Sequence, residues 1–373
     1  MPEREKSRLV LTTCGTSILT NDVDQERRRM INRLANHKED ELTPEERERL
    51  DRHIEERWQL LVDASLEQVK RMSAELNGLI NYYGGNLTPR PGRPDEHILL
   101  TSDTYLGRRV GDVLKEWLEE RGFNVQVWCP GGLATKSRED FRRAMAELIR
   151  RCEGALPFRR DAGYHVAFNL TGGFKSVQGF MQVVGMFYAD EMFYIFETGS
   201  SLITIPRLPI RLETEAIVRD HEQPFRRLGN GEVLPVEECR EIPEDLLFEV
   251  DSDATLSEWG ELIWQRGEKA LYSEKLLEPL PGLRYSPNFR KKVQRLKLSP
   301  DRLATLNERL DSLSLTVRGK KPNLSGLDFK QLRSNPKPPS THECDVWSDD
   351  ERRLFGHYEG STFIVDDIER GLH

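Results

Sequence analysis

Short apolar runs alternate with longer amphipathic segments through the first two hundred residues of the chain. The runs with the length and composition of strands are 8–13, 97–102, 123–129, 164–168, 191–196 and 202–205. The segments with helical periodicity are 22–81, 105–121, 139–152 and 177–188. Strands that alternate with helices in this way predict an α/β fold with a doubly wound, Rossmann-like parallel sheet.

One strand-to-helix junction carries the motif Asn-Leu-Thr-Gly-Gly-Phe-Lys-Ser at 169–176. Gly172 and Gly173 allow the backbone to approach a ligand closely, and free N–H groups at a helix start favour an anion. Thr171 adds a hydroxyl and Lys175 a positive charge. The spacing fits neither a Walker loop nor G-x-G-x-x-G, so a plain tight turn is the alternative to a phosphate site.

Two further loops follow strands of the same predicted sheet. Cys-Gly-Thr-Ser at 14–17 follows the first strand, and Ser-Asp-Thr at 102–104 follows the second. Because ligands of such sheets bind at the carboxyl ends of the strands, the two glycine-containing loops should face one pocket.

The rest of the chain divides at Pro281 and Gly282. Residues 211–281 predict a small, winged-helix-like connector, in which the helix 255–267 buries its tryptophans in a core. Residues 282–373 predict an α+β domain, with a short strand, a basic helix, a second helix at 300–315 and then successive β-segments. The expected domains are therefore 1–210, 211–281 and 282–373.

Composition and charge narrow the class of protein. The chain has 373 residues, 37% of them hydrophobic, and a net charge of −8, yet residues 284–337 hold 14 Lys and Arg against 4 Asp and Glu. That basic segment suggests nucleic-acid contact, with a merely solvated basic face as the alternative. No apolar run is long enough for a membrane span, and no secretory signal is seen. No membrane partner is therefore expected. Five scattered cysteines without a C-x-x-C pair indicate reduced thiols in the cytoplasm and no metal site.

The strand that runs into Cys-Gly-Thr-Ser and the later Asn-Leu-Thr-Gly-Gly-Phe-Lys together resemble a CARF domain, the CRISPR-associated Rossmann-fold sensor, over residues 1–210. The resemblance implies a homodimer that binds cyclic oligoadenylate, here cyclic tetra-adenylate, as allosteric activator, with no other cofactor. A symmetric cyclic ligand suits a pocket built from two copies of the same loops. The ligand-binding residues that it implies are Gly15, Thr16, Ser17, Thr171, Gly172, Gly173 and Lys175. Asn169 could instead hold the turn, and whether such a sensor also degrades its ligand stays open.

Residues 282–373 resemble the RelE family of ribosome-dependent mRNA interferases, most clearly in Tyr-Ser-Pro-Asn-Phe-Arg-Lys at 285–291 and Arg-Leu-Phe at 353–355. The resemblance implies a CRISPR-associated interferase that cuts mRNA in the ribosomal A site without metal. Attack by the 2′-hydroxyl needs a base, an acid and positive charge on the phosphate.

The residues of this sequence match the RelE pattern only in part. Arg353 and Arg370 stand where the family has arginines, but Thr-His-Glu-Cys-Asp at 341–345 replaces its lysine pair. The identity of the base and acid therefore stays open. The candidates are His342 and His357, with Lys330 and Arg333 to hold phosphate and His373 in place of a C-terminal tyrosine.

Two other functions remain possible from the sequence. Arg352 and His357 satisfy the R-x4-H motif of HEPN ribonucleases, which would act on free RNA, but that motif requires a helix. Gly356 and Gly360 favour a β-hairpin here. A ligand-responsive transcription regulator, with the connector as DNA reader, is the other alternative.

Overall fold

The computed structural model describes residues 6–89, 95–133, 137–196, 201–209, 213–323, 325–333 and 337–371. The chain forms two compact units, a first unit of Met1–Arg211 and a second unit of Leu212–His373. Each unit contains a β-sheet of its own, with the six-stranded sheet in the first unit and the five-stranded sheet in the second.

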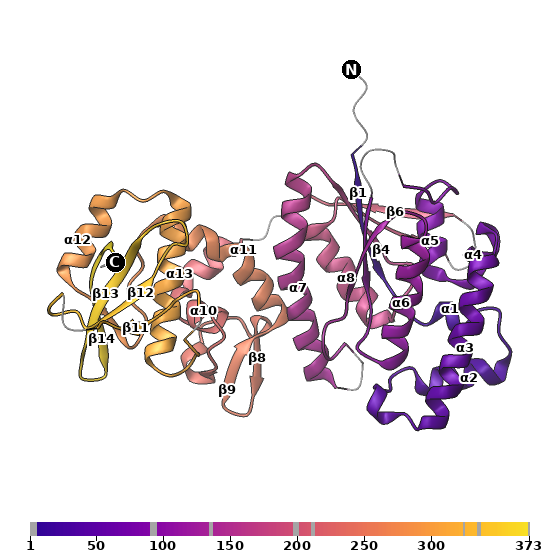
Figure 1. Cartoon of the computed structure of the whole chain (residues 1–373), viewed down its shortest axis with the longest axis horizontal. Coiled ribbons are helices and arrows are strands. Elements are labelled where there is room, and N and C mark those ends of the chain that lie inside the picture. Colours follow the sequence, from indigo (N-terminus) through magenta and orange to yellow (C-terminus); the bar gives the residue numbers. More distant parts are fainter. Residues whose placement is uncertain are drawn as a thin grey trace, which may run out of the picture. The chain divides into compact units, whose positions relative to one another are not determined.

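The first unit is built on a six-stranded sheet with the order β3-β2-β1-β4-β5-β6 (Figure 1). Its strands are β1 (Arg8–Thr13), β2 (Glu96–Leu100), β3 (Asn124–Trp128), β4 (His165–Asn169), β5 (Glu191–Ile195) and β6 (Leu202–Pro206). The first five run parallel, and β6 pairs with β5 antiparallel at the edge. The predicted α/β fold with a Rossmann-like, mainly parallel sheet is confirmed.

Helices cover both faces of this sheet, as right-handed crossovers require. The helices between β1 and β2, together with α6 (Tyr105–Glu119), lie on one face, whereas α7 (Arg138–Asp161) and α8 (Lys175–Tyr188) lie on the other (Figure 1). The elements between β1 and β2 are α1 (Ser17–Thr20), α2 (Gln25–Leu34), η1 (Glu39–Glu41), α3 (Pro44–Asp63), α4 (Leu66–Met72) and α5 (Ala74–Tyr82). Pro44 occupies the first turn of α3, where its missing N–H costs no helical hydrogen bond.

α7 is longer than the predicted helix, which ended at residue 152. The buried positions continue with helical spacing through Cys152 and Leu156, so packing carries the helix past Pro157. The helix ends only before Gly163, which has a φ of +91°. The buried apolar face thus outweighs the lost hydrogen bond of one proline.

The N-terminal part of the second unit is helical, with a small sheet. It contains α9 (Thr214–Asp220), α10 (Glu222–Gly229), β7 (Leu234–Pro235), η2 (Val236–Cys239), η3 (Glu244–Leu246), β8 (Leu247–Val250), β9 (Asp253–Leu256) and α11 (Glu258–Glu274). The three strands are ordered β7-β9-β8. Trp264 of α11 is 2% exposed, which confirms its predicted place in a core.

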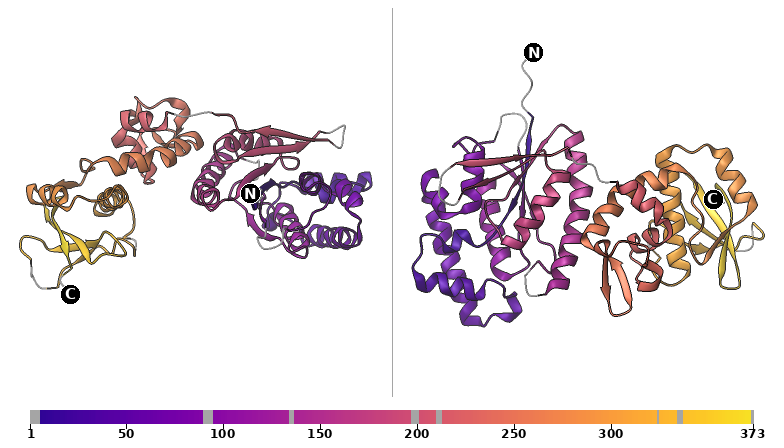
Figure 2. Two further views of the ribbon diagram at one scale, coloured as in Figure 1. Left: turned by 90° about the horizontal axis from the view of Figure 1, so that it is seen from above. Right: turned by 180° about the vertical axis from the view of Figure 1, so that it is seen from behind.

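The C-terminal part of the second unit is a five-stranded sheet with two helices (Figure 2). Its elements are β10 (Leu283–Tyr285), α12 (Pro287–Leu296), α13 (Pro300–Val317), β11 (Lys330–Gln331), β12 (His342–Asp345), β13 (Arg352–Glu359) and β14 (Thr362–Arg370). The strand order is β10-β14-β13-β12-β11. Apolar side chains of α12 and α13 share one core with this sheet. The predicted order of strand, two helices and β-segments is confirmed.

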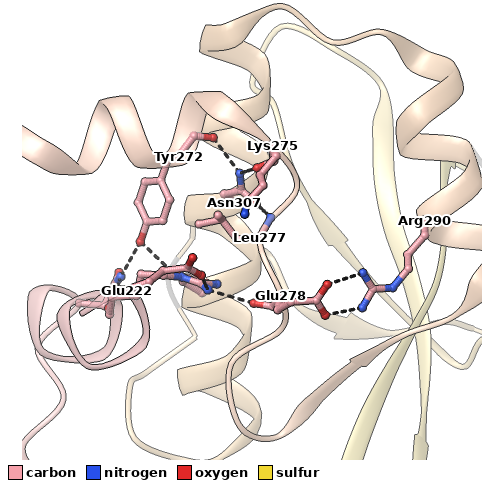
Figure 3. Close-up of polar contacts among 10 residues, drawn as sticks. Glu222, Tyr272, Lys275, Leu277, Glu278, Arg290 and Asn307 are labelled. Atoms are coloured by element: carbon pink, nitrogen blue, oxygen red, sulfur yellow. Dashed lines mark hydrogen bonds and ion pairs between the residues drawn. The ribbon is translucent and has the colours of Figure 1, made fainter. Parts of the chain in front are cut away.

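Buried polar contacts join the two parts of the second unit (Figure 3). The Asn307 side chain of α13 donates to the carbonyls of Tyr272 (2.7 Å) and Lys275 (2.8 Å) and accepts from the Leu277 N–H. The fully buried Arg226 of α10 donates to both carboxylate oxygens of Asp311 at 2.9 and 2.6 Å. The expected connector and the expected C-terminal domain therefore lie within one compact unit.

All five cysteines are free thiols. Cys14, Cys152, Cys239 and Cys344 are buried, and Cys129 is half-buried. Burial raises the pKa of Cys152 and of Cys344 well above the usual thiol range. Within the described residues, no helix combines the length and apolar character needed to cross a membrane.

Candidate functional site

The loops after β1 and β4 lie side by side at the point where the strand order of the first sheet reverses. β1 is the neighbour of both β2 and β4, and the helices that follow β1 and β4 leave on opposite faces of the sheet. Such a switch point opens a crevice at the carboxyl ends of the strands. A Cβ on Gly15 would stand 3.1 Å from the backbone nitrogen of Gly173, so the two predicted glycine loops are in contact.

The turn after β4 is held by side chains of the chain itself. The Thr13 hydroxyl donates to the Gly172 carbonyl at 2.5 Å. The Thr171 hydroxyl donates to the Asn169 side-chain oxygen at 2.7 Å, and the Asn169 amide donates to the Glu75 carbonyl at 2.9 Å. These contacts support the alternative in which the Asn169 side chain holds the turn. The hydroxyl of Thr171 is also engaged in the turn.

Glu75, at the start of α5, is the residue at this site that the sequence did not single out. Its side chain is fully buried, and one carboxylate oxygen accepts the Gly15 N–H at 2.8 Å. The other oxygen accepts the hydroxyls of Ser17 and, at 2.8 Å, Ser73. Two donors assigned to the ligand by sequence are therefore occupied by a carboxylate. Burial, and after it the Glu75 charge, raise the pKa of Cys14 well above its usual range, which disfavours the reactive thiolate.

The N-terminus of α8 remains open to an anion. Its N-cap residue, Phe174, makes no side-chain capping hydrogen bond, and Lys175 and Ser176 of the first turn are exposed. The first N–H groups of a helix carry partial positive charge, which Lys175 reinforces. Of the predicted ligand residues, Gly173 and Lys175 are thus the best placed to bind phosphate. Thr16 is half-buried at the start of α1.

The third predicted loop, 102–104, serves local structure. The Thr104 hydroxyl caps α6 by accepting the Gly107 N–H at 3.0 Å, and it also pairs with the Ser102 hydroxyl at 2.9 Å. The Asp103 carboxylate accepts the Gly132 N–H at 2.9 Å.

The register of the second unit's sheet divides its candidate residues between two faces. His342 is directly opposite Gly356, so the next residue of β13, His357, points to the other face. Arg353 is opposite Asp345 and Glu369, whereas Arg370 is opposite Arg352 and shares the face of His342. We call the face that carries Lys330, Glu343, Asp345, Arg353, Phe355, His357 and Glu369 the charged face. His342 and His357 consequently cannot act as one acid–base pair.

His357 is oriented by a carboxylate. Its Nδ1 lies 2.8 Å from Asp366, and the same carboxylate oxygen accepts the Ser340 hydroxyl at 2.7 Å. Asp366 is the unpaired residue of a bulge, because Phe355 is opposite Asp367 and Gly356 is opposite Val365. The alternation of apolar and polar residues in the sequence does not indicate this bulge, so Asp366 could not be identified without the structure.

Arg353 and Lys330 meet carboxylates on the charged face. Arg353 pairs with Glu343 at 2.6 Å, Asp345 at 3.0 Å and Asp328 at 3.7 Å. Lys330 pairs with Asp328 at 2.6 Å. Their charge is therefore largely offset in the free protein.

A lysine that the sequence analysis did not select, Lys337, also contacts this face. Its Nζ pairs with Asp367 at 3.1 Å and with Glu369, and it lies 4.2 Å from the Phe355 ring centroid. Burial lowers the pKa of Lys337 from its usual value.

The other candidates have different surroundings from His357. His342 stacks on Phe329 at 5.2 Å between ring centroids and meets Tyr358 edge-on, and burial lowers its pKa. Arg370 is 84% exposed at the end of β14, and Arg333 is exposed after β11. His373 lies outside the described residues.

The described residues hold no cluster of three His, Cys, Asp or Glu side chains suited to a metal ion.

Comparison with known families gives a match within the first unit. Residues 70–208 match the family described as "CRISPR-associated protein (Cas_APE2256)". The matched segment includes Glu75, the strands β2 to β6 and the turn at 169–176. The comparison with curated proteins gives no match. Over residues 70–208 the chain is therefore similar to a family of CRISPR-associated proteins, and this similarity indicates a CRISPR-associated protein.

Proposed function

We propose that the chain is a ligand-activated effector of type III CRISPR defence, in which the first unit binds cyclic oligoadenylate and the second unit cleaves mRNA on the ribosome. The observation that carries the proposal is the contact between the loops after β1 and β4, at the switch point of a sheet whose strands β2 to β6 lie in the segment similar to a CRISPR-associated family. The preferred ligand is cyclic tetra-adenylate, bound by a homodimer in the cytoplasm.

The open N-terminus of α8 supports the sensor part of the proposal. A phosphate placed there meets free N–H groups and the Lys175 ammonium, which is the arrangement that polyphosphate ligands require. A cyclic ligand with repeated phosphates can reach two copies of this helix start in a two-fold dimer. Binding then shifts the protein toward its active state by as much as the ligand prefers that state.

The charged face supports the effector part of the proposal. His357, held by Asp366, takes the proton of the RNA 2′-hydroxyl, whose oxygen then attacks the adjacent phosphorus. The bond from phosphorus to the 5′-oxygen breaks, which leaves a 2′,3′-cyclic phosphate and a 5′-hydroxyl. Lys337, which lies 4.2 Å from the Phe355 ring on the charged face, is the candidate acid for that oxygen, and burial lowers its pKa. Arg353 and Lys330 provide charge for the phosphate once it replaces their carboxylate partners.

The test uses 70S ribosomes programmed with a defined mRNA, with and without cyclic tetra-adenylate, and maps cuts by primer extension. We expect cleavage in the A-site codon only with the ligand. His357→Ala should lower the cleavage rate about 100-fold or more, as loss of a general base does. The matched control is His342→Ala, on the other face, which should retain most activity. Equal cutting of free RNA would contradict ribosome dependence, and cutting that survives His357→Ala would remove His357 from the mechanism.

A ligand-responsive transcription regulator is the second candidate. It is favoured by the carboxylates around Arg353, which weaken the case for a phosphate-binding face. Against it, the segment between β7 and β8 forms 3₁₀ turns rather than an α-helix and carries Glu237, Glu238, Glu241, Glu244 and Asp245. Acidic side chains there would repel DNA phosphates. A defined operator footprint without ribosomal cleavage would decide for the regulator. The HEPN alternative loses support because Arg352 and His357 lie on strand β13.

A further inference from the structure

The Gly15 N–H and the Ser17 hydroxyl are hydrogen-bond donors, and the chain itself already supplies their acceptor. Both donate to the carboxylate of Glu75, which the Ser73 hydroxyl also holds. A carboxylate oxygen and a phosphate oxygen accept the same donors in the same way. The chain therefore supplies its own anion at the place where the first glycine loop would contact a ligand.

The surrounding backbone is shaped around this carboxylate. A Cβ on Gly172 would collide with the Glu75 side chain, so the second glycine loop leaves the room that the carboxylate takes. The Asn169 amide, which holds the turn after β4, donates to the Glu75 backbone carbonyl at 2.9 Å. Glu75 thus lies between the two glycine loops and is tied to both.

Resting on the proposed sensor function, we infer that Glu75 is an internal competitor that sets ligand selectivity. A single phosphate contacts only the N-terminus of α8, and the nearby negative charge of Glu75 repels it. A ligand with several linked phosphates gains enough contacts to take the Gly15 and Ser17 donors from Glu75. The sensor therefore ignores abundant monophosphates and responds to a polyphosphate ring.

The test measures binding to the full-length protein by calorimetry, with inorganic phosphate, AMP and cyclic tetra-adenylate as probes. Glu75→Gln keeps the shape of the side chain and removes its charge. We expect at least tenfold tighter binding of phosphate and AMP than in the wild type, and a smaller gain for the cyclic ligand. Glu26→Gln is the control, because Glu26 is 90% exposed on α2 and gives the same change in net charge.

A second variant provides an independent test in case Glu75→Gln does not fold. Ser73→Gly removes one donor to Glu75 while glycine remains an acceptable N-cap for α5. It should also bind phosphate more tightly than the wild type. In hydrogen exchange, the amide of Gly15 should lose protection in Glu75→Gln and regain it with pyrophosphate.

The outcomes separate the two proposals. Folded Glu75→Gln and Ser73→Gly proteins that bind phosphate and AMP no better than Glu26→Gln would overturn the role of Glu75. If cyclic tetra-adenylate binds none of the proteins, the proposed ligand is wrong, and the phosphate and exchange data still decide whether Glu75 competes for the loop.

Discussion

The residue Gly172 has a steric role that can be tested apart from any ligand. A Cβ added there would meet the buried Glu75 carboxylate, whereas a Cβ on Gly179 of α8 meets no atom within 4 Å. We expect Gly172→Ala to lower the free energy of unfolding by about 1–3 kcal/mol, as overpacking does. Gly179→Ala should raise it by roughly 0.5–1 kcal/mol because alanine favours the helix. Urea denaturation of both variants measures the contrast, and equal effects would contradict the packing.

His97 gives the first unit a defined pH dependence. Its side chain is fully buried in β2, and burial lowers its pKa to about 3. The unfolded chain takes up a proton near pH 6.5 that the folded protein refuses, so stability falls as the pH decreases from about 6.5 toward 3. At pH 5 we expect a loss of roughly 2 kcal/mol from this residue.

The measurement is the urea midpoint of the first unit at several pH values. His97→Gln should flatten the slope between pH 6.5 and 5, since glutamine does not titrate. An unchanged slope in that variant would assign the acid sensitivity to other groups.

Single residues also mark the limit of what the sequence predicts about the site. Gly15 and Gly173 could be placed together because strand ends in a parallel sheet meet at one edge. Glu75 and Asp366 could not, since the first reaches the site from a helix sixty residues away and the second from a bulge. The opposite faces of His342 and His357 likewise depend on register, which sequence separation alone does not reveal.

At the scale of elements, the open N-terminus of α8 is the feature on which ligand binding should depend most. Lys175→Met retains the apolar stem and removes the charge beside the helix start. We expect at least tenfold weaker binding of cyclic tetra-adenylate, with a shallower salt dependence than in the wild type, because one cationic contact is lost. Calorimetry at two salt concentrations measures both quantities.

Lys115→Met is the matched control for that variant. Lys115 lies on α6 with a side chain 42% exposed, and it pairs only with Glu119 of the same helix among the ion pairs described. Equal losses of affinity in the two variants would show a general charge effect rather than a site at α8.

The element boundaries show why the fold was easier to predict than the site. Apolar periodicity predicts β1, α6 and the hairpin of β13 and β14. Gly122 marks the end of α6, and Gly360 marks the turn of the hairpin. α7 overran its prediction because tertiary burial at Leu156 outweighs the local preference of Pro157. Local patterns therefore sufficed for most elements, whereas side-chain convergence required the sheet order.

At the scale of the whole molecule, the two compact units make a simple prediction. All residues assigned to the ligand lie in the first unit, Met1–Arg211. A fragment of residues 1–211 should bind cyclic tetra-adenylate within about threefold of the full chain, a difference of less than 1 kcal/mol. A fragment of residues 212–373 should not bind it. Loss of binding in the first fragment would mean that the second unit contributes to the site.

The buried cysteines make this chain well suited to labelling. Four of the five thiols are inaccessible, and burial also raises the pKa of the half-buried Cys129. Maleimide dyes react with thiolates, so the native cysteines should stay unmodified at neutral pH. One new cysteine on α2 and another on α12 could then carry a fluorophore pair. Energy transfer between them would report any ligand-driven movement of one unit against the other in real time.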